Sequence, residues 1–553
     1  MAILPPGVTA AEFASALKGF EAAVGKEWVF TAEDDLAPYR DPFSFLKDQP
    51  GELIASGAVA PVTVEQVQAV VRVANQYKIP LYSVSTGKNY AYGGASPNVV
   101  GSVVVDLKRM NKVLDVDEHR HFALVEPGVN YMDLYRHIQE RGLKLWVDTP
   151  DPGWGSPIGN ALDHGIGYTL GFYRDHFGAH CGMEVVLANG EVMRTGMGAL
   201  PGSKTWQEYR HGFGPDPSGL FGQGNYGIVT KMGFRLMPQP EHWRNGLITV
   251  PKRADLIPLV NTVNYLTDLF MIGEPWYGSP LFALMGNTEF REAATRRGGV
   301  NDAELDRLAG AAGLHSWQVE LQFYGSEKTT LANWEYAKEL ILRAVPSARI
   351  VDGESLKVPL TPAQIKNTTG PYRTNMRRNV TQGVPGLGIW YMPSRSENNP
   401  NDWFQTHFGL FSIVPRSGEG IFEAQRAFSE VAAEFDLPPG PTALGTPVNW
   451  YQFTFIMGSG FALGKDNSPE GKKQQARILH RMAEANGKRG FGDYRAPPMF
   501  QDVVSEQFSF NDHALRRFNE AIKDAVDPNG ILSPGRGGVW PKRLRTMRGG
   551  IKL

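Results

Sequence analysis

Cysteine is almost absent from this chain. Cys181 is the only one among 553 residues, which excludes an intrachain disulfide and any metal site built from cysteines alone. The first residues also lack the basic segment and long apolar run of a secretory signal. We therefore predict an intracellular, cytoplasmic protein. The last three residues, 551–553, resemble a peroxisomal signal only faintly because the first of them is not small, and an ordinary tail is the preferred interpretation.

An excess of charge of either sign and long apolar runs are missing as well. Lys and Arg number 56 against 57 Asp and Glu, a formal net charge of -1, so the charge balance favours neither nucleic acid nor an anionic membrane as a partner. No apolar stretch reaches the roughly 18 residues of a membrane span. The hydrophobic share of 42% is that of a folded globular protein, and a length of 553 residues predicts two domains.

Local patterns up to about residue 238 mix helices and strands between glycine-rich turns. Thr63 and Gln66 form a capping box ahead of a helical apolar pattern. Strands are expected at 79–85 and 102–107, and Asn130 opens another helix. These patterns predict an α+β fold.

The rest of the chain has a different pattern. Helical periodicity over 254–268 and 328–344 alternates with strand-like runs. The strand-like runs occupy 317–321 and 408–414, and a polar stretch at 394–402 between them is expected to be an exposed loop. A final helix, which stops at the turn 527–530, carries its apolar residues at spacings of three and four: Leu515, Phe518, Ile522 and Val526.

The most informative segment is the loop 83–94, which follows the strand-like run 79–82. It offers small residues, hydroxyl groups, backbone N–H donors and one cation, Lys88. Such a loop suits a phosphate-bearing cofactor because main-chain donors can approach the anion closely. Its tyrosines, Tyr90 and Tyr92, are not needed for that task, so we expect the loop to face a substrate as well.

A second glycine pattern is misleading. Residues 222–227 spell G-x-G-x-x-G, but the following run 228–236 alternates like a strand, whereas a dinucleotide fingerprint opens a helix. The pattern is therefore not interpreted as a Rossmann motif. Several further glycine-rich turns indicate a large cofactor in a groove lined by loops; they lie at 126–129, 155–160, 165–168 and 534–538.

An ordered set of motifs carries a family resemblance. The motifs are 85–89 with 92–94, 125–129, 182–190, 194–202, 493–495 and 526–536. With them the chain resembles the vanillyl-alcohol oxidase and 4-cresol dehydrogenase family of FAD-dependent phenol oxidoreductases, the eugenol oxidases being the most similar branch. The resemblance implies bound FAD and a two-domain α+β fold. It also implies a discontinuous FAD-binding domain, 1–238 with 487–553, and a cap domain, 239–486.

The resemblance implies oxidation of para-substituted phenols through a p-quinone methide, with hydride passing to flavin N5. Tyr92, Tyr494 and Arg495 match the family's phenolate-binding residues and are called here the phenolate clamp. The chemistry agrees, because phenol has a pKa of about 10 and needs a cation and donors to ionise at neutral pH. Asp151 matches the acid beside N5 and is the expected base. Arg377 is expected to stabilise negative charge near flavin N1.

The resemblance also implies a set of cofactor-binding positions. His407 aligns with the histidine that relatives join covalently to the flavin 8α-methyl, although a one-residue shift would put Phe408 there and leave the flavin unlinked. The other positions are Ser85, Thr86, Gly87, Lys88, Asn89, Gly128, Gly159, Asn160, Gly167, Glu184, Gly227, Ile228, Val229 and Arg536. His176 and His180 have the spacing of a metal pair, but their loop resembles a flavin-facing loop of the family and no metal is predicted. Asp148 is interpreted as a turn residue.

Several alternatives stay open. Dioxygen is the expected electron acceptor, but a dehydrogenase that passes electrons to a cytochrome is also compatible. A sugar or alditol oxidase on the same fold would not need the phenolate clamp, and a flavoprotein without turnover is the non-enzyme alternative. A homodimer is the family default. Trp450, Tyr451 and Gln452 stand where relatives carry Met-His-His, so the particular phenol does not transfer from the family.

Overall fold

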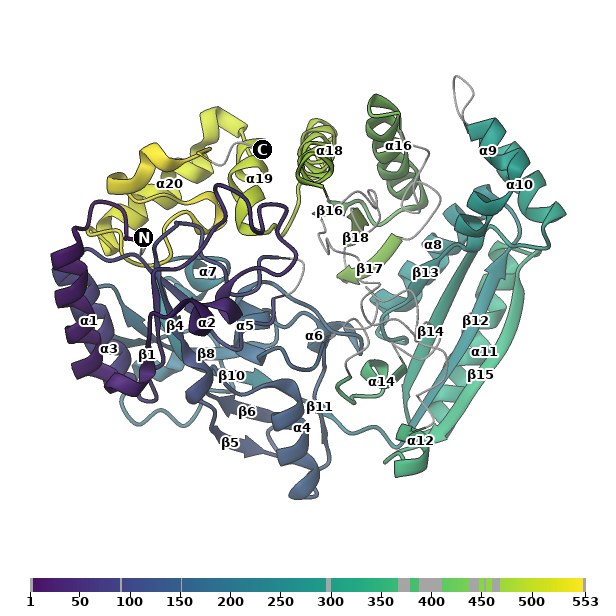
Figure 1. The fold of residues 1–553 in the computed structure, drawn as a ribbon. Coiled ribbons are helices and arrows are strands. Elements are labelled where there is room, and N and C mark those ends of the chain that lie inside the picture. Colours follow the sequence, from purple (N-terminus) through teal and green to yellow (C-terminus); the bar gives the residue numbers. More distant parts are fainter. Residues whose placement is uncertain are drawn as a thin grey trace.

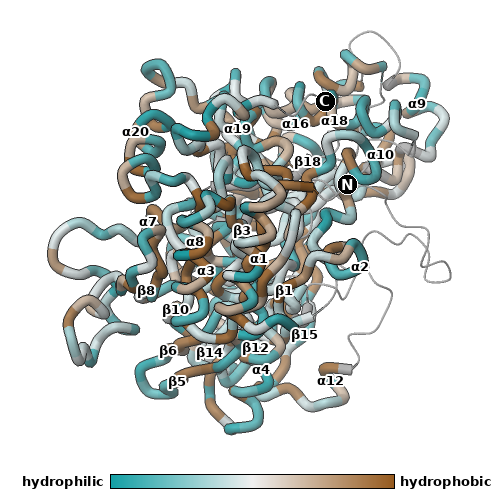
Figure 2. The backbone as a smooth tube through the Cα atoms, turned by 60° about the vertical axis from the view of Figure 1, so that its left-hand side comes forward, coloured by the Kyte–Doolittle hydropathy of each residue, from teal (hydrophilic) through white to brown (hydrophobic). Residues whose placement is uncertain are grey.

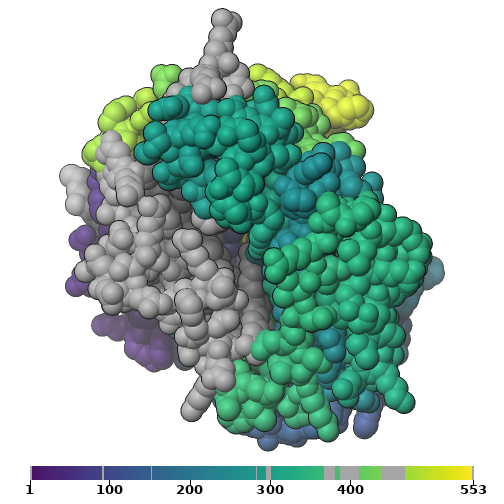
Figure 3. Space-filling model, turned by 90° about the vertical axis from the view of Figure 1, so that its right-hand side faces the viewer, coloured from purple at the N-terminus to yellow at the C-terminus, as the bar shows by residue number. Residues whose placement is uncertain are grey.

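The computed structural model describes residues 3–89, 92–150, 152–294, 300–366, 378–386, 410–436, 447–451, 454–459 and 468–550. Two groups of sheets lie side by side (Figure 1). The N-terminal half of the chain forms one group, and the C-terminal segment returns to cover it. The middle of the chain forms the other group, and it makes up much of the face seen in Figure 3. The α+β prediction is therefore confirmed.

Two sheets organise the first group. One has the order β1-β2-β4-β3, with β2 and β3 both parallel to β4. The other is antiparallel, with the order β5-β6-β10-β8-β9. Their strands are β1 (Val29–Phe30), β2 (Gly57–Val59), β3 (Leu81–Val84), β4 (Val103–Asp106), β5 (Val113–Asp117), β6 (Phe122–Val125), β8 (His180–Leu187), β9 (Val192–Arg194) and β10 (Gly227–Arg235). A short pair joins β7 (Leu145–Trp146) to β11 (Met237–Pro238).

Helices cover these sheets. The principal ones are α1 (Ala10–Val24), α3 (Val64–Tyr77), α4 (Tyr131–Glu140) and α5 (Pro157–Leu162). The predicted cap of α3 is half right: Thr63 Oγ1 accepts the Gln66 N–H, but the Gln66 side chain accepts from Val62 N at 2.7 Å rather than from Thr63. The buried side of α3, with Val67, Val70 and Val71, packs into the same core as β3 and β4.

The second group is built on the antiparallel sheet β13-β14-β12-β15. Its strands are β12 (His242–Val250), β13 (Trp276–Gly278), β14 (Trp317–Gly325) and β15 (Arg349–Lys357). The helices α8 (Leu256–Asp268) and α11 (Glu327–Ala344) share its core. A smaller sheet has the order β16-β18-β17, formed by β16 (Leu410–Val414), β17 (Pro447–Tyr451) and β18 (Thr454–Ser459).

The remaining helices border these sheets. The longest are α16 (Gly418–Glu434), α18 (Pro469–Lys488) and α20 (Phe510–Val526), and the short helix α19 (Gln501–Gln507) precedes α20. The shorter ones are α2 (Glu33–Leu36), α6 (Gly171–Arg174), α7 (Ser218–Phe221), α9 (Thr288–Ala294), α10 (Asp302–Ala311), α12 (Pro362–Lys366) and α14 (Arg378–Thr381). Hydrophobic stretches gather among the central helices and strands, and hydrophilic ones occupy much of the periphery (Figure 2). In the part of the chain that the structure describes, no helix is both long and apolar enough to cross a membrane.

The C-terminal segment is bound to the first group of sheets. Leu81 N donates to Ile531 O at 2.6 Å and Ser533 N donates to Leu81 O at 2.8 Å, so residues 531–533 extend the edge of β3. The G-x-G-x-x-G stretch packs on the same segment, with Asn225 Nδ2 donating to Ser533 O at 3.2 Å. That glycine pattern therefore leads into the strand β10, as its context predicted, and Asn225 within it also anchors the chain end.

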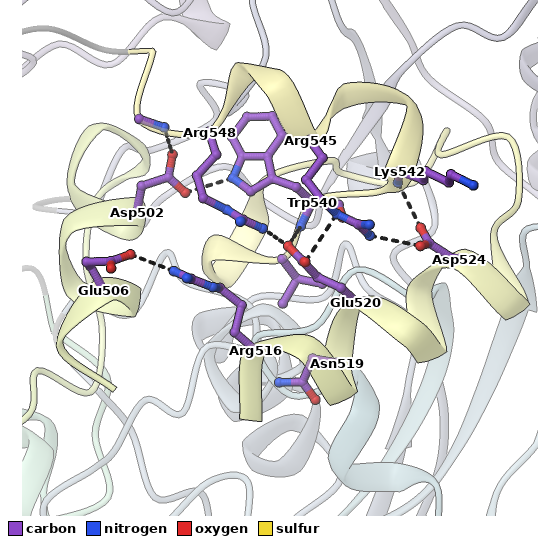
Figure 4. A network of polar contacts seen from close by, with 12 residues as sticks. Asp502, Glu506, Arg516, Asn519, Glu520, Asp524, Trp540, Lys542, Arg545 and Arg548 are labelled. Carbon is purple, nitrogen blue, oxygen red and sulfur yellow. Dashed lines mark hydrogen bonds and ion pairs between the residues drawn. The ribbon is translucent and has the colours of Figure 1, made fainter. Parts of the chain in front are cut away.

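Helix α20 differs from its apolar pattern. Leu515 is 59% exposed and Phe518 is 63% exposed, so part of the apolar stripe faces outward. The inner face instead carries an ionic network around Glu520, which receives Arg545 Nε at 3.1 Å and also contacts Arg548 (Figure 4). Ion pairs and the partly buried Ile522 together hold this helix in place.

Candidate functional site

The phosphate-type loop lies against the helix α5. Gly159 on α5 faces Ser85 so closely that a Cβ on Gly159 would lie 2.2 Å from Ser85 Oγ. Gly87 adopts φ 67° and Gly93 adopts φ 98°, conformations that glycine reaches without steric cost. Thr86 is buried and Lys88 is exposed. The loop and α5 therefore pack directly against each other at Ser85 and Gly159, and their role as a cofactor cradle stays a prediction.

The three residues of the phenolate clamp come together from distant parts of the chain. The Arg495 guanidinium carbon lies 3.8 Å from the Tyr92 ring centroid and 5.2 Å from that of Tyr494. Tyr494 is held by the strand β16, because its N–H donates to Phe411 O at 3.2 Å. The Phe411 ring packs on Tyr92 with centroids 5.5 Å apart. The clamp therefore lies where β16 of the second group meets the loop after β3.

Burial keeps the tyrosines of the clamp neutral. It raises the pKa of Tyr92 and the pKa of Tyr494, and the nearby Arg495 charge only partly opposes this. Burial disfavours the charge of Arg495, but the two tyrosines and Asp163 outweigh it and raise the pKa of the guanidinium. The clamp thus combines two neutral hydroxyl groups with one permanent cation, which is the arrangement that stabilises an ionised phenol oxygen.

Asp163 joins the phenolate clamp to the loop after β3 and to the C-terminal segment. This residue was not among those predicted from the sequence. Its carboxylate receives Arg536 Nη2 at 2.6 Å, Asn89 Nδ2 at 2.8 Å and Arg495 Nη1 at 3.5 Å. Arg536 also donates to the Tyr82 hydroxyl at 3.0 Å. The only signal was its position as the single acid between the glycine-rich turns 155–160 and 165–168.

A second buried carboxyl group lies directly beside the clamp. Asp493 Oδ1 accepts from Ser412 Oγ at 2.9 Å, and Ser412 Oγ accepts from Asn486 Nδ2 at 2.7 Å. Burial raises the pKa of Asp493 to about 7, and the Ser412 hydrogen bond offsets only part of this. This carboxyl group therefore titrates near neutral pH, next to Tyr494 in the chain.

In the segment that carries His176 and His180, His176 contacts the buried residues Asp148 and Tyr131. Asp148, interpreted as a turn residue, is instead buried; it accepts from Thr169 N at 2.7 Å and contacts His176 Nε2 at 2.8 Å. His176 Nδ1 also bonds the Tyr131 hydroxyl at 3.0 Å. Gly167 packs so tightly here that a Cβ would lie 1.3 Å from Asp148 Oδ1. His176 thus serves a buried network that holds the Gly167 turn.

Other predicted cofactor positions are occupied by protein contacts. Gly128 N donates to Met110 O at 2.7 Å. Glu184 is buried on β8 and receives Lys231 Nζ at 2.6 Å and Arg194 Nε at 2.9 Å. Asn160 follows Gly159 on the helix α5, where a glycine-rich turn was predicted, and Gly227, Ile228 and Val229 begin the predicted strand β10.

Three predicted residues lie outside the described residues. They are Asp151, Arg377 and His407. The polar loop 394–402 lies outside them as well. Their assignments stay predictions.

Comparisons with known proteins place this fold and site in a class. Residues 55–196 match the model of an FAD binding domain. The chain is 32% identical over 541 residues to the 4-cresol dehydrogenase [hydroxylating] flavoprotein subunit of Pseudomonas putida, covering 97% of this chain and 98% of that protein. The fold and the site therefore define an FAD-dependent oxidoreductase.

Two solved structures agree over the whole length. The 4-ethylphenol oxidase from Gulosibacter chungangensis is 33% identical, with a TM-score of 0.78 over 98% of this chain and 100% of that one. A p-cresol methylhydroxylase with bound substrate is 30% identical, with a TM-score of 0.80 over 98% and 99%. The chain belongs to the vanillyl-alcohol oxidase/p-cresol methylhydroxylase family of flavoproteins.

Proposed function

We propose that this protein oxidises para-substituted phenols, 4-alkylphenols and 4-hydroxybenzyl alcohols, at the benzylic carbon. The observation that carries the proposal is the stacking of Arg495 on the Tyr92 ring at 3.8 Å beside Tyr494. A neutral polyol needs no such cation, so the clamp favours a phenol over a sugar or alditol. The relatives named above act, by their names, on 4-cresol and 4-ethylphenol.

The described residues explain how a phenol would be activated. The tyrosines Tyr92 and Tyr494 keep their protons, so their hydroxyl groups can donate to the phenol oxygen, and Arg495 compensates its charge as the phenol ionises. Electron density from the phenolate moves toward the para position and assists departure of hydride from the benzylic carbon. Bound FAD supplies the acceptor for that hydride and its two electrons.

The product step needs a base. Loss of hydride converts the phenolate to a neutral p-quinone methide, which adds water at the benzylic carbon or loses a proton from the next carbon. We propose Asp151 for the proton transfer and Arg377 for the negative charge near flavin N1, following the family pattern. A variant Asp151→Asn is expected to slow product formation more than binding.

The mode of FAD attachment, the oligomeric state and the domain division are also proposed from the family pattern. We propose covalent attachment of FAD through His407, a homodimer, and the domain division 1–238, 239–486 and 487–553. Acid precipitation tests the first: yellow colour in the pellet supports the covalent link, and colour in the supernatant contradicts it. Light scattering on the holoenzyme tests the second, and limited proteolysis at the two boundaries tests the third.

The electron acceptor has two candidates. Dioxygen is the proposed acceptor, and a protein electron carrier is favoured by the relative that is a dehydrogenase flavoprotein subunit. The test is anaerobic mixing of the yellow holoenzyme with 4-ethylphenol, 4-ethylanisole and xylitol while flavin absorbance is followed. We expect bleaching by 4-ethylphenol alone, since the ether and the polyol cannot form a phenolate. Rapid return of colour in air supports the oxidase, and slow return supports the carrier; no bleaching by any phenol contradicts the proposed function.

A further inference from the structure

Asp163 lies at the end of α5, where three segments meet. Its side chain is 10% exposed, and its three donors come from the loop after β3, the phenolate clamp and the C-terminal segment. The bond to Arg536 Nη2 is short at 2.6 Å, and that to Asn89 is 2.8 Å, whereas Arg495 Nη1 lies 3.5 Å away. Arg536 and Asn89 therefore fix the carboxylate, and the fixed carboxylate in turn limits where Arg495 can lie.

Asp163 and the charged groups around it have a net charge of one positive unit. Two guanidinium groups, Arg495 and Arg536, share one carboxylate. Other titratable groups near them are Tyr82, Tyr92, Tyr494 and His164. Burial lowers the pKa of His164, so this imidazole is uncharged at neutral pH.

Arg495 has a buried donor, Nε, without an acceptor in the described residues. Its side chain is 14% exposed, and its Nε is buried with no hydrogen-bond partner in the described part of the molecule. A buried donor without an acceptor is unfavourable, and a bound oxygen anion would satisfy it. The Tyr92 ring supports the face of the guanidinium, and Asp163 engages Nη1, so neither of these two contacts supplies an acceptor for Nε.

We propose that Asp163 is a positioning residue, which holds Arg495 in the orientation that meets the substrate oxygen and limits the positive charge there to that of one guanidinium. This inference rests on the proposed function. It adds that ionisation of the bound phenol is set by a residue outside the clamp. It also links the clamp to the segments proposed to hold FAD, because Asn89 and Arg536 hold the same carboxylate.

The test uses a phenol that cannot be oxidised. 4-Bromophenol has no benzylic carbon, so its ionisation in the oxidised holoenzyme can be followed by ultraviolet difference spectra as pH is varied. In Asp163→Asn the net positive charge near the phenol rises from that of one guanidinium group to that of two. We therefore expect the pKa of the bound phenol to fall by about one unit. We also expect flavin reduction by 4-ethylphenol to slow about tenfold because Arg495 is less well oriented.

Two further variants control the experiment. Glu520→Gln also removes a buried carboxylate between two arginines, Arg545 and Arg548, but outside the site, and should leave the pKa of the bound phenol unchanged. Asp163→Glu keeps the charge and should keep that pKa while slowing flavin reduction; it decides the matter if Asp163→Asn does not retain FAD. An unchanged pKa in folded, FAD-loaded Asp163→Asn, or a changed one in Asp163→Glu, would overturn the proposal. Wild-type protein that neither binds 4-bromophenol as phenolate nor is bleached by 4-ethylphenol would contradict the proposed function itself.

Discussion

At the scale of single residues, the site depends on how Arg495 is held. The Tyr92 ring supports one face of its planar guanidinium, and Asp163 lies beside Nη1. A flat group held in this way can present a donor in a fixed direction, which a flexible ammonium group cannot do. Orientation, and not charge alone, is therefore expected to set activity.

The variant Arg495→Lys tests that expectation. It keeps the positive charge but loses the planar stacking on Tyr92 and the reach to Asp163. We expect kcat/KM for 4-ethylphenol to fall about 100-fold or more, as for loss of an oriented donor in other active sites. Steady-state kinetics with measured FAD content would show this, and an activity within about threefold of wild type would contradict it.

Asp493 gives a pH dependence of stability. Its pKa is about 7 in the folded protein, above the ordinary value of 3.8. The folded state thus binds a proton that the unfolded state has released between about pH 4 and pH 7. Stability from this group is complete at low pH and is lost as pH rises through that window, by a few kcal/mol at most.

The variant Asp493→Asn cannot ionise and still offers an oxygen to Ser412. We expect the loss of thermal stability between pH 5 and pH 8 to be smaller than in wild type. Melting temperatures of both proteins at the two pH values provide the measurement. Equal losses in both proteins would show that Asp493 does not titrate in this range.

At the scale of elements, glycine conformations decide where the clamp lies. Gly93 follows Tyr92 with φ 98°, and a Cβ there would lie 2.2 Å from Pro498 Cδ. The loop after β3 and the segment before α19 therefore pack together only because this position has no side chain.

The variant Gly93→Ala should displace Tyr92. Gly51→Ala is the matched control, because Gly51 has φ 90° and an open surrounding. The control should cost about 1–2 kcal/mol from the backbone alone, whereas Gly93→Ala should also lower phenol turnover about tenfold or more. Melting temperature and flavin reduction rate are measured for both, and equal effects on reduction would contradict the role of the contact.

The sequence predicts individual helices and strands better than it predicts the tertiary contacts between them. Runs with a clear period, such as 228–236 and 328–344, became β10 and α11 within about two residues. Tyr92 and Arg495 are far apart in the sequence, and only the family motifs joined them. An aspartate before a glycine turn is ordinary turn chemistry, so the position of Asp163 between two glycine-rich turns did not distinguish it: its role depends on arginines from the other end of the chain.

Helix α20 illustrates the same limit. Its apolar spacing predicts a helix, and a helix forms. The apolar face is partly outward because Glu520 and Lys523 are buried by partners beyond the helix. Periodicity indicates which residues share a face, but the ionic partners decide which face turns inward.

At the scale of the whole molecule, the C-terminal segment closes the first group of sheets. Lys523 and Asp527 form a pair at 2.7 Å, and both side chains are 0% exposed. Lys523 Nζ also donates to Leu532 O at 2.6 Å, and Asp527 accepts from Ile531 N at 3.0 Å. This pair shapes the segment that extends β3 and leads to Arg536.

The variant Lys523→Met leaves a buried, unpaired carboxylate. We expect it to destabilise the fold by about 3–5 kcal/mol and to lower FAD retention, while the exposed Lys542→Met should change little. The double variant Lys523→Met with Asp527→Asn should recover part of the loss, since it removes the unpaired charge. Thermal unfolding of the four proteins gives the answer, and a wild-type melting temperature for Lys523→Met would contradict it.

The most direct test of the central claim is an isotope effect on flavin reduction. The oxidised holoenzyme is mixed anaerobically with 4-ethylphenol or with 4-ethylphenol deuterated at the benzylic carbon, and loss of flavin absorbance is timed. If hydride leaves the benzylic carbon of a phenolate held by Tyr92, Tyr494 and Arg495, reduction should be several-fold slower with the deuterated phenol. Equal rates with both phenols, or no reduction by either, would contradict the account.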